Sequence, residues 1–215
     1  MKTLSFVLLV TGSSTFCSPS FAQQNWYVKP YLGLSQLSDT NGNARVIDQI
    51  GGTANINTDS GFIAGIGVGY HYSNNFAVEI DWEYRSNDSQ TTIDDSVTYE
   101  EGNYASSMFS INGIWSFNNF DRIKPYVGAG LLWAQEIDID LETNGEELSY
   151  SGSSDTGFQG FVGLDYRVSE RWLANVEVRY GSVTGIDLDG EDTTGNISDL
   201  DYQTTTLQFG VKYKF

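Results

Sequence analysis

The sequence predicts an all-β fold, a transmembrane, antiparallel, up-and-down β-barrel of eight strands. Three observations predict it. Segments of about ten residues alternate apolar and polar side chains, short turns alternate with long polar connections, and aromatic residues gather near the segment ends. Alternation with period two gives a strand one apolar and one polar face, because successive side chains point to opposite sides of the pleat. Closing the sheet leaves no unpaired backbone edge in lipid.

Residues 1–22 are expected to be a secretory signal peptide. Lys2 supplies a positive charge, residues 4–10 form a short apolar run, and Ser20-Phe21-Ala22 ends the segment in a small-x-small pattern. Residues 23–215 then form a single barrel domain. The only cysteine, Cys17, lies within the signal, so the mature domain is expected to contain no disulfide.

Each expected strand shows the alternation. In the third, Phe76, Val78, Ile80, Trp82 and Tyr84 share one face, and Ala77, Glu79, Asp81, Glu83 and Arg85 share the other. Ten residues at about 3.3 Å each and a tilt near 45° rise about 23 Å, close to the apolar thickness that a barrel must cross. The expected strands are residues 26–36, 60–72, 76–86, 104–117, 124–136, 156–168, 172–183 and 202–215.

An internal repeat supports the strand assignment, because each of the first four expected strands resembles the strand four places later in the chain. The first and fifth share the motif that reads Lys29-Pro30-Tyr31-Leu32-Gly33 and Lys124-Pro125-Tyr126-Val127-Gly128. The second and third match the sixth and seventh at an offset of 96 residues, as in Gly61-Phe62 and Gly157-Phe158. The fourth and eighth end in similar aromatic patterns, at Phe117 and Phe215. Two explanations stay open, an ancestral duplication and a restricted composition imposed by the bilayer.

The connections alternate in length. Residues 73–75, 118–123 and 169–171 are short turns, whereas residues 37–59, 87–103, 137–155 and 184–201 are long and polar. Outer-membrane barrels place short turns in the periplasm and long loops outside the cell. Because the number of strands is even, both ends of the chain lie on the periplasmic side.

The signal peptide, the eight alternating strands and the terminal aromatic residue resemble the small outer-membrane β-barrel families, including the OmpA transmembrane domain, OmpX and the opacity-type, porin-family proteins. The resemblance covers the mature chain as an architecture, and no motif selects one member. It implies the outer membrane of a Gram-negative bacterium, contact with outer-membrane lipid and lipopolysaccharide, and a monomer. The chain departs from full-length OmpA in ending at the barrel, so no peptidoglycan-binding domain is expected. The last strand also resembles the signal read by the outer-membrane assembly machinery, carried here by Phe209, Val211, Tyr213 and Phe215.

Charged side chains are expected to fill the barrel interior. An eight-stranded barrel is just wide enough for side chains, so buried charges there must pair. Lys29 and Lys124 belong to the inward-facing set. We expect a plugged lumen, with a narrow ion path as the functional alternative. The predicted network comprises Glu79, Asp81, Glu83, Arg85, Asp165, Arg167, Glu177, Arg179, Lys212 and Lys214.

No catalytic residue is predicted. The single histidine, His71, is expected to face the lumen near the periplasmic end, far from the outer loops where a lipid-modifying site would lie. No histidine lies near the outer loops to activate one of their serines. We therefore expect a structural and surface-interaction role without enzymatic activity. A porin-like ion or solute channel is the second hypothesis and a lipid-active barrel enzyme is the third.

The long connections carry most of the 28 acidic residues, and the net charge of −17 argues against nucleic-acid binding. Carboxylates at Asp187, Asp189, Glu191 and Asp192 are spaced as in some hard-cation sites, and Asp138, Asp140 and Glu142 repeat the theme. These positions make Ca²⁺ a speculative ligand, and no other cofactor is expected. A solvated acidic surface is the simpler interpretation.

Overall fold

The computed structural model describes residues 25–46, 50–118, 121–143, 146–152, 155–190 and 195–215. The predicted signal peptide lies outside these ranges. Within the described part of the chain, no helix is long and apolar enough to cross a membrane. The strands are β1 (Trp26–Leu37), β2 (Thr40–Val46), β3 (Ile50–Thr58), β4 (Ser60–His71), β5 (Phe76–Ile93), β6 (Val97–Tyr99), β7 (Glu101–Ser116), β8 (Ile123–Thr143), β9 (Glu146–Gly152), β10 (Thr156–Arg167), β11 (Trp172–Gly190) and β12 (Gly195–Lys214).

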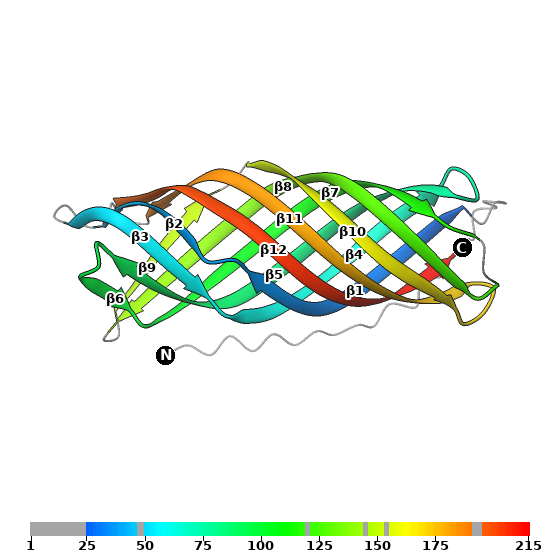
Figure 1. Ribbon diagram of the computed structural model, residues 1–215, viewed down its shortest axis with the longest axis horizontal. Helices are drawn as coiled ribbons and strands as arrows, with labels where there is room; N and C mark the ends of the chain where they lie inside the picture. The colour runs from blue at the N-terminus through cyan, green and yellow to red at the C-terminus, as the bar shows by residue number, and fades with distance from the viewer. Residues whose placement is uncertain (1–24, 47–49, 119–120, 144–145, 153–154, 191–194) are drawn as a thin grey trace, which may run out of the picture.

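Eight long strands form the predicted antiparallel barrel. The pairings run from β1 through β4, β5, β7, β8, β10, β11 and β12, and β12 pairs with β1 again. Figure 1 shows the strands tilted around a common axis, with the short turns and the C-terminus at one end. The three predicted short turns fall between β4 and β5, β7 and β8, and β10 and β11. The fold class is therefore confirmed.

The long connections differ from the expected polar loops because most of their residues lie in strands. β2 pairs with β12 and β3, and β3 pairs with β5. On the other side of the barrel, β9 pairs with β8 and, over two residue pairs, with β11. The sheet thus continues above the expected membrane section, as the left end of Figure 1 shows. The described residues hold twelve strands in place of eight.

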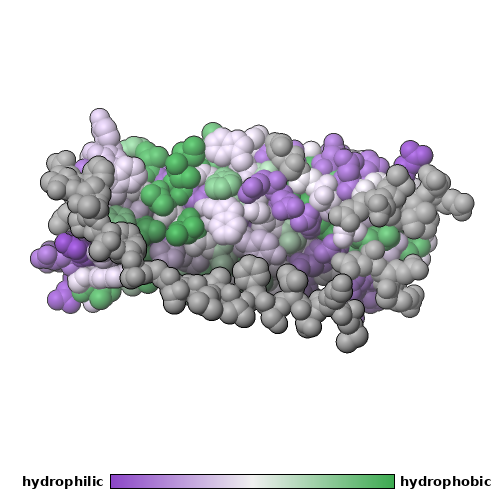
Figure 2. Space-filling model, turned by 180° about the vertical axis from the view of Figure 1, so that it is seen from behind, coloured by the Kyte–Doolittle hydropathy of each residue, from purple (hydrophilic) through white to green (hydrophobic). Residues whose placement is uncertain are grey.

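A belt of apolar side chains surrounds the end of the barrel that carries the short turns. Leu32, Phe62, Ile80 and Phe158 are each more than half exposed. Such exposure is unfavourable in water and is what contact with lipid requires. Figure 2 shows apolar residues on the wall toward one end and hydrophilic residues over the other. The belt marks the membrane-spanning section of each strand.

The polarity of the two faces reverses in the outer section. There the interior is apolar and the exterior is polar, as in a water-soluble barrel. On β11, Ile186 and Leu188 are fully buried while Asp187 and Asp189 are exposed. The apolar cluster that fills this section includes Leu37, Ile56, Ile93, Tyr104, Met108, Leu132, Ile137, Ile139, Leu141, Tyr150, Val183, Ile197, Leu200 and Tyr202.

On β8 and β11, register shifts accompany this reversal. On β8 the register with β7 shifts between Ser107 and Met108, and the buried positions change there from Ala134 to Ile137. On β11 the register with β12 shifts after Val183, next to Gly185, which has a φ of 70°. A bulge inserts one residue and so moves the following side chains to the opposite face. Beyond the inserted residue, apolar side chains therefore face the interior, and the outward-facing side chains change from apolar to polar.

Candidate functional site

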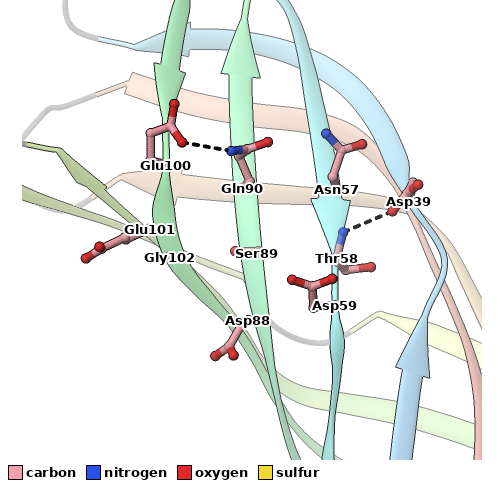
Figure 3. Close-up of a pocket in the computed structure, with 10 residues that line it drawn as sticks. All are labelled: Asp39, Asn57, Thr58, Asp59, Asp88, Ser89, Gln90, Glu100, Glu101 and Gly102. Carbon is pink, nitrogen blue, oxygen red and sulfur yellow. Dashed lines mark hydrogen bonds between the residues drawn. The ribbon is translucent and has the colours of Figure 1, made fainter.

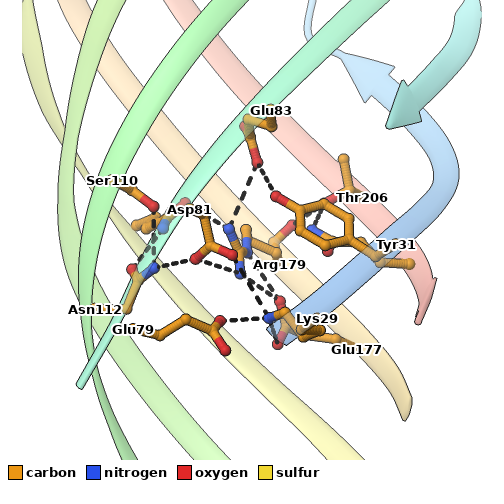
Figure 4. Close-up of polar contacts among 12 residues, drawn as sticks. Lys29, Tyr31, Glu79, Asp81, Glu83, Ser110, Asn112, Glu177, Arg179 and Thr206 are labelled. Carbon is orange, nitrogen blue, oxygen red and sulfur yellow. Dashed lines mark hydrogen bonds and ion pairs between the residues drawn. The ribbon is translucent and has the colours of Figure 1, made fainter. Parts of the chain in front are cut away.

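The interior of the membrane-spanning section holds a buried network of charged side chains. They come mainly from three strands: β1 supplies Lys29, β5 supplies Glu79, Asp81 and Glu83, and β11 supplies Glu177 and Arg179. Figure 4 shows these side chains converging on the barrel axis. The alternation of each strand places them there, because every second residue must point inward while its neighbours face lipid.

Arg179 lies at the centre of this network. Its Nη2 lies 2.8 Å from Glu177 Oε1 and 3.8 Å from Asp81 Oδ2, and its Nη1 lies 3.5 Å from Glu83 Oε2. The guanidinium also lies over the ring of Phe161, with its Cζ 4.7 Å from the ring centroid. A planar guanidinium can serve several carboxylates at once, so it suits a position between strands better than an ammonium group does.

Lys29 connects the two sides of the lumen. Its Nζ donates to Glu79 and lies 3.8 Å from Asp81 Oδ1 and 3.9 Å from Glu177 Oε2. These carboxylates stand on opposite strands, and all of the side chains are buried. A buried charge is tolerated only when partners compensate for its lost hydration. Lys29 is therefore as central to the network as Arg179.

Further contacts extend the network toward both ends. Above the centre, Arg85 donates to Glu83 Oε1 through Nη2 at 2.7 Å, and below it Lys212 Nζ lies 2.9 Å from Asp165 Oδ2. Neutral side chains add further hydrogen bonds, for example from Asn112 Nδ2 to Asp81 Oδ2 at 2.6 Å. Above Arg85, the interior is filled by the apolar cluster of the outer section.

Eight of the ten predicted network residues make these ion pairs, but Arg167 and Lys214 enter none of those found among the described residues. Both lie at the periplasmic end, where Arg167 is exposed and Lys214 is only partly buried. His71 lies there too, with its ring centroid 5.0 Å from that of Tyr27. Alternation indicates the direction of a side chain, but it does not indicate how far along the barrel axis the side chain lies.

The acidic residues of the proposed cation site do not form a cluster in the described residues. Asp187 and Asp189 lie on β11 and point outward, and Glu191 and Asp192 fall outside the described ranges. Asp187 Oδ1 accepts a hydrogen bond from the backbone N–H of Asp199 at 3.1 Å. The described residues contain no group of three acidic, histidine or cysteine side chains placed to hold a metal. The Asp-x-Asp spacing follows from the strand, whose pleat sends alternate residues outward.

A separate acidic notch lies on the outer surface, where β1 gives way to β2 and β3 gives way to β4. Its cavity of about 580 Å³ is bordered by Asp39, Asp59, Asp88, Glu100 and Glu101 (Figure 3). Asp39 Oδ1 accepts a hydrogen bond from the backbone N–H of Thr58, at 2.9 Å. Sequence reasoning missed this notch because its carboxylates come from two separate connections, residues 37–59 and 87–103, which only strand pairing brings together.

Acidic groups also influence one another near the top of β10. Burial, and then the negative charge of Asp187, raise the pKa of Asp155 above its ordinary value. Both effects disfavour the ionised carboxylate. The outer section is thus a surface on which negative charges lie close together, and Arg45 on β2 is the only base among its described residues.

The residues of the proposed assembly signal line the lipid face of β12. Phe209, Val211 and Phe215 are exposed, and Tyr213 lies against Trp172 with ring centroids 4.7 Å apart. They form the periplasmic end of the apolar belt. This placement matches the predicted outward face of the last strand.

Comparison with known proteins gives consistent results. The family model described as "Outer membrane protein beta-barrel domain" matches residues 8–215. Outer membrane protein W of Escherichia coli (strain K12) is 33% identical over 86 residues, a segment that spans 38% of this chain and only 37% of that relative.

Solved structures resemble the fold at low sequence identity. The outer membrane protein OprG from Pseudomonas aeruginosa superimposes with a TM-score of 0.64 at 15% identity, covering 89% of this chain and 95% of that one. Neisserial surface protein A superimposes with a TM-score of 0.55 at 17% identity, covering 88% of this chain and 97% of that one. Both are similar in fold to the barrel described above.

Proposed function

The chain belongs to the outer membrane β-barrel domain family and resides in the outer membrane of a Gram-negative bacterium, and from that premise we propose a structural and surface-interaction role without enzymatic activity. The barrel anchors itself in the bilayer through its apolar belt and presents a polar, acidic outer section to the exterior. The described residues bring no histidine or cysteine to that section, so acid–base or nucleophilic chemistry there would lack its usual groups.

One observation carries the proposal, which is that the inward-facing side chains are buried both in the membrane-spanning section and in the section above it. The charged network occupies the membrane-spanning section and the apolar cluster occupies the section above it. An ion would need to break several buried ion pairs and then cross an apolar plug without solvent. Both steps are costly, so a closed lumen is favoured over a diffusion pore.

The proposed partners are outer-membrane lipid, lipopolysaccharide and the assembly machinery, with the barrel acting as a monomer. The exposed Phe209 and Phe215 support contact with outer-membrane lipid and with the assembly machinery. The acidic notch around Asp59 and Asp88 lies just above the apolar belt, where anionic headgroups would require divalent cations between the two surfaces. Calcium at Asp187 and Asp189 remains part of the proposal.

Planar-bilayer recording of the refolded barrel tests the closed lumen. We expect no reproducible discrete conductance at neutral pH from the wild type. In Arg179→Ala, removal of the central guanidinium leaves space and unpaired carboxylates, so conductance should appear or increase. Arg171→Ala is the matched control, because Arg171 lies on a periplasmic turn outside the network. Discrete conductance from the wild type would reject the closed lumen and favour the porin-like channel.

A further inference from the structure

The periplasmic mouth of the barrel is a concave, positively charged surface apart from the buried network. Two cavities of about 280 Å³ each open there and share Lys124 and Asn74. Arg167 borders one of them, and Lys214 and His71 border the other. The charges therefore converge from β8, β10 and β12, which are separate strands of the ring.

The cations of this mouth have few acidic partners. Lys124, Arg167 and Lys214 make none of the ion pairs found in the described part of the chain. Among the described lining residues of both cavities, Asp121 is the only carboxylate. The next acidic group inward, Asp165, already contacts Lys212 at 2.9 Å and Asn175 at 2.7 Å.

These positive groups lie close enough to act on one another. The charges of Lys124, Lys212 and Arg167 all repel the partly buried Lys214 ammonium, and the Asp165 carboxylate offsets part of this repulsion. Holding like charges together is unfavourable unless an anion offsets the repulsion. The arrangement contrasts with the composition of a protein that carries a net charge of −17. A local excess of positive charge in a concave surface is thus a specific feature of this end.

We propose that the periplasmic mouth binds a phosphate group. Lys124 and Lys214 supply point charges, Arg167 supplies a planar guanidinium that can pair with two oxygens, and the Asn74 amide can donate a further hydrogen bond. The phosphate comes either from a soluble phosphate in the periplasm or from the headgroup of an anionic phospholipid in the inner leaflet. Both sources present the same chemistry to the same side chains.

Two double variants lower the total charge of the protein by the same amount. Lys124→Gln/Lys214→Gln removes two cations that border the cavities. Arg122→Gln/Arg171→Gln removes two cations of the same rim that border neither. Heat-modifiable migration on a gel verifies that the full barrel of each variant has folded.

Two measurements separate the sources. Calorimetry with inorganic phosphate, in zwitterionic detergent, reports soluble phosphate. Native mass spectrometry of barrels released from nanodiscs of phosphatidylcholine and phosphatidylglycerol reports retained anionic lipid. In at least one measurement we expect wild-type binding that weakens by about tenfold or more in Lys124→Gln/Lys214→Gln, as loss of charge-assisted bonds implies, and is retained in the arginine pair.

Binding of inorganic phosphate identifies a soluble ligand, whereas selective retention of phosphatidylglycerol alone identifies a lipid headgroup. Absence of binding in both measurements would overturn the proposal. An equal loss in the two double variants would also overturn it, because general rim charge, and not the mouth, would then be responsible.

Discussion

At the scale of single residues, the lumen depends on a few charges that hold many partners. Two pairs, Glu83 with Arg85 and Glu177 with Arg179, are visible in the sequence because residues two apart on a strand share a face. The contact of Lys29 with Glu79 is not visible there, since it joins β1 and β5, which are separated by β4. Its geometry depends on the stagger of strands around the barrel.

Replacing Arg179 by Met should destabilise the barrel strongly. The change leaves Glu177, Asp81 and Glu83 without their shared cation, and loss of one partner in a buried ion pair costs about 3–5 kcal/mol. Urea unfolding in micelles, followed by tryptophan fluorescence, measures this loss. Arg171→Met, at an exposed turn, should change the free energy of unfolding by less than about 0.5 kcal/mol. Equal effects would contradict a central role for Arg179.

At the scale of elements, the outer connections show how one pattern supports two interpretations. Asp187 and Asp189 flank Leu188, just as Asp138 and Asp140 flank Ile139. The acidic spacing by itself fits a cation site, but the intervening residues also satisfy the alternation of a strand. In the structure the apolar members are fully buried and the acidic members face outward. The apolar residues between the carboxylates were the available signal for a strand.

Leu188→Ala should therefore destabilise the outer section, whereas Asp189→Ala should not. A buried leucine truncated to alanine typically costs about 2–5 kcal/mol through lost burial and a residual cavity. Hydrogen–deuterium exchange of the backbone amides of β9, β11 and β12 measures the effect locally. Faster exchange only in Leu188→Ala is expected. Rapid exchange of these amides in the wild type would contradict the strand assignment.

At the scale of the whole molecule, three zones follow one another along the barrel axis. A basic mouth opens at the periplasmic end, a charged interior lies within the apolar belt, and an acidic exterior covers an apolar core at the far end. Figure 2 shows the outer wall of the last two zones, with apolar residues toward one end and hydrophilic residues over the other. Each zone matches its surroundings, because lipid requires an apolar wall and water permits a polar one.

The calcium proposal is tested on the whole acidic surface. Calorimetry with CaCl₂ should give a larger heat for the wild type than for Asp187→Ala/Asp189→Ala, because carboxylate oxygens are the ligands Ca²⁺ prefers. Asp94→Ala/Asp95→Ala removes the same charge from another connection and serves as the control. Identical traces for the wild type and the first variant would remove calcium from these positions.

The sequence by itself determined the alternation of side chains in the membrane section and the number of strands in the ring, and it predicts a signal peptide. It could do so because a bilayer forces each spanning strand to alternate, and that constraint is local. Only the tertiary structure decided which inward charges meet, that the outer connections continue the sheet over an apolar core, and that Lys124, Arg167 and Lys214 converge at the mouth. Those contacts depend on register, bulges and the closure of the ring, which join residues far apart in the chain.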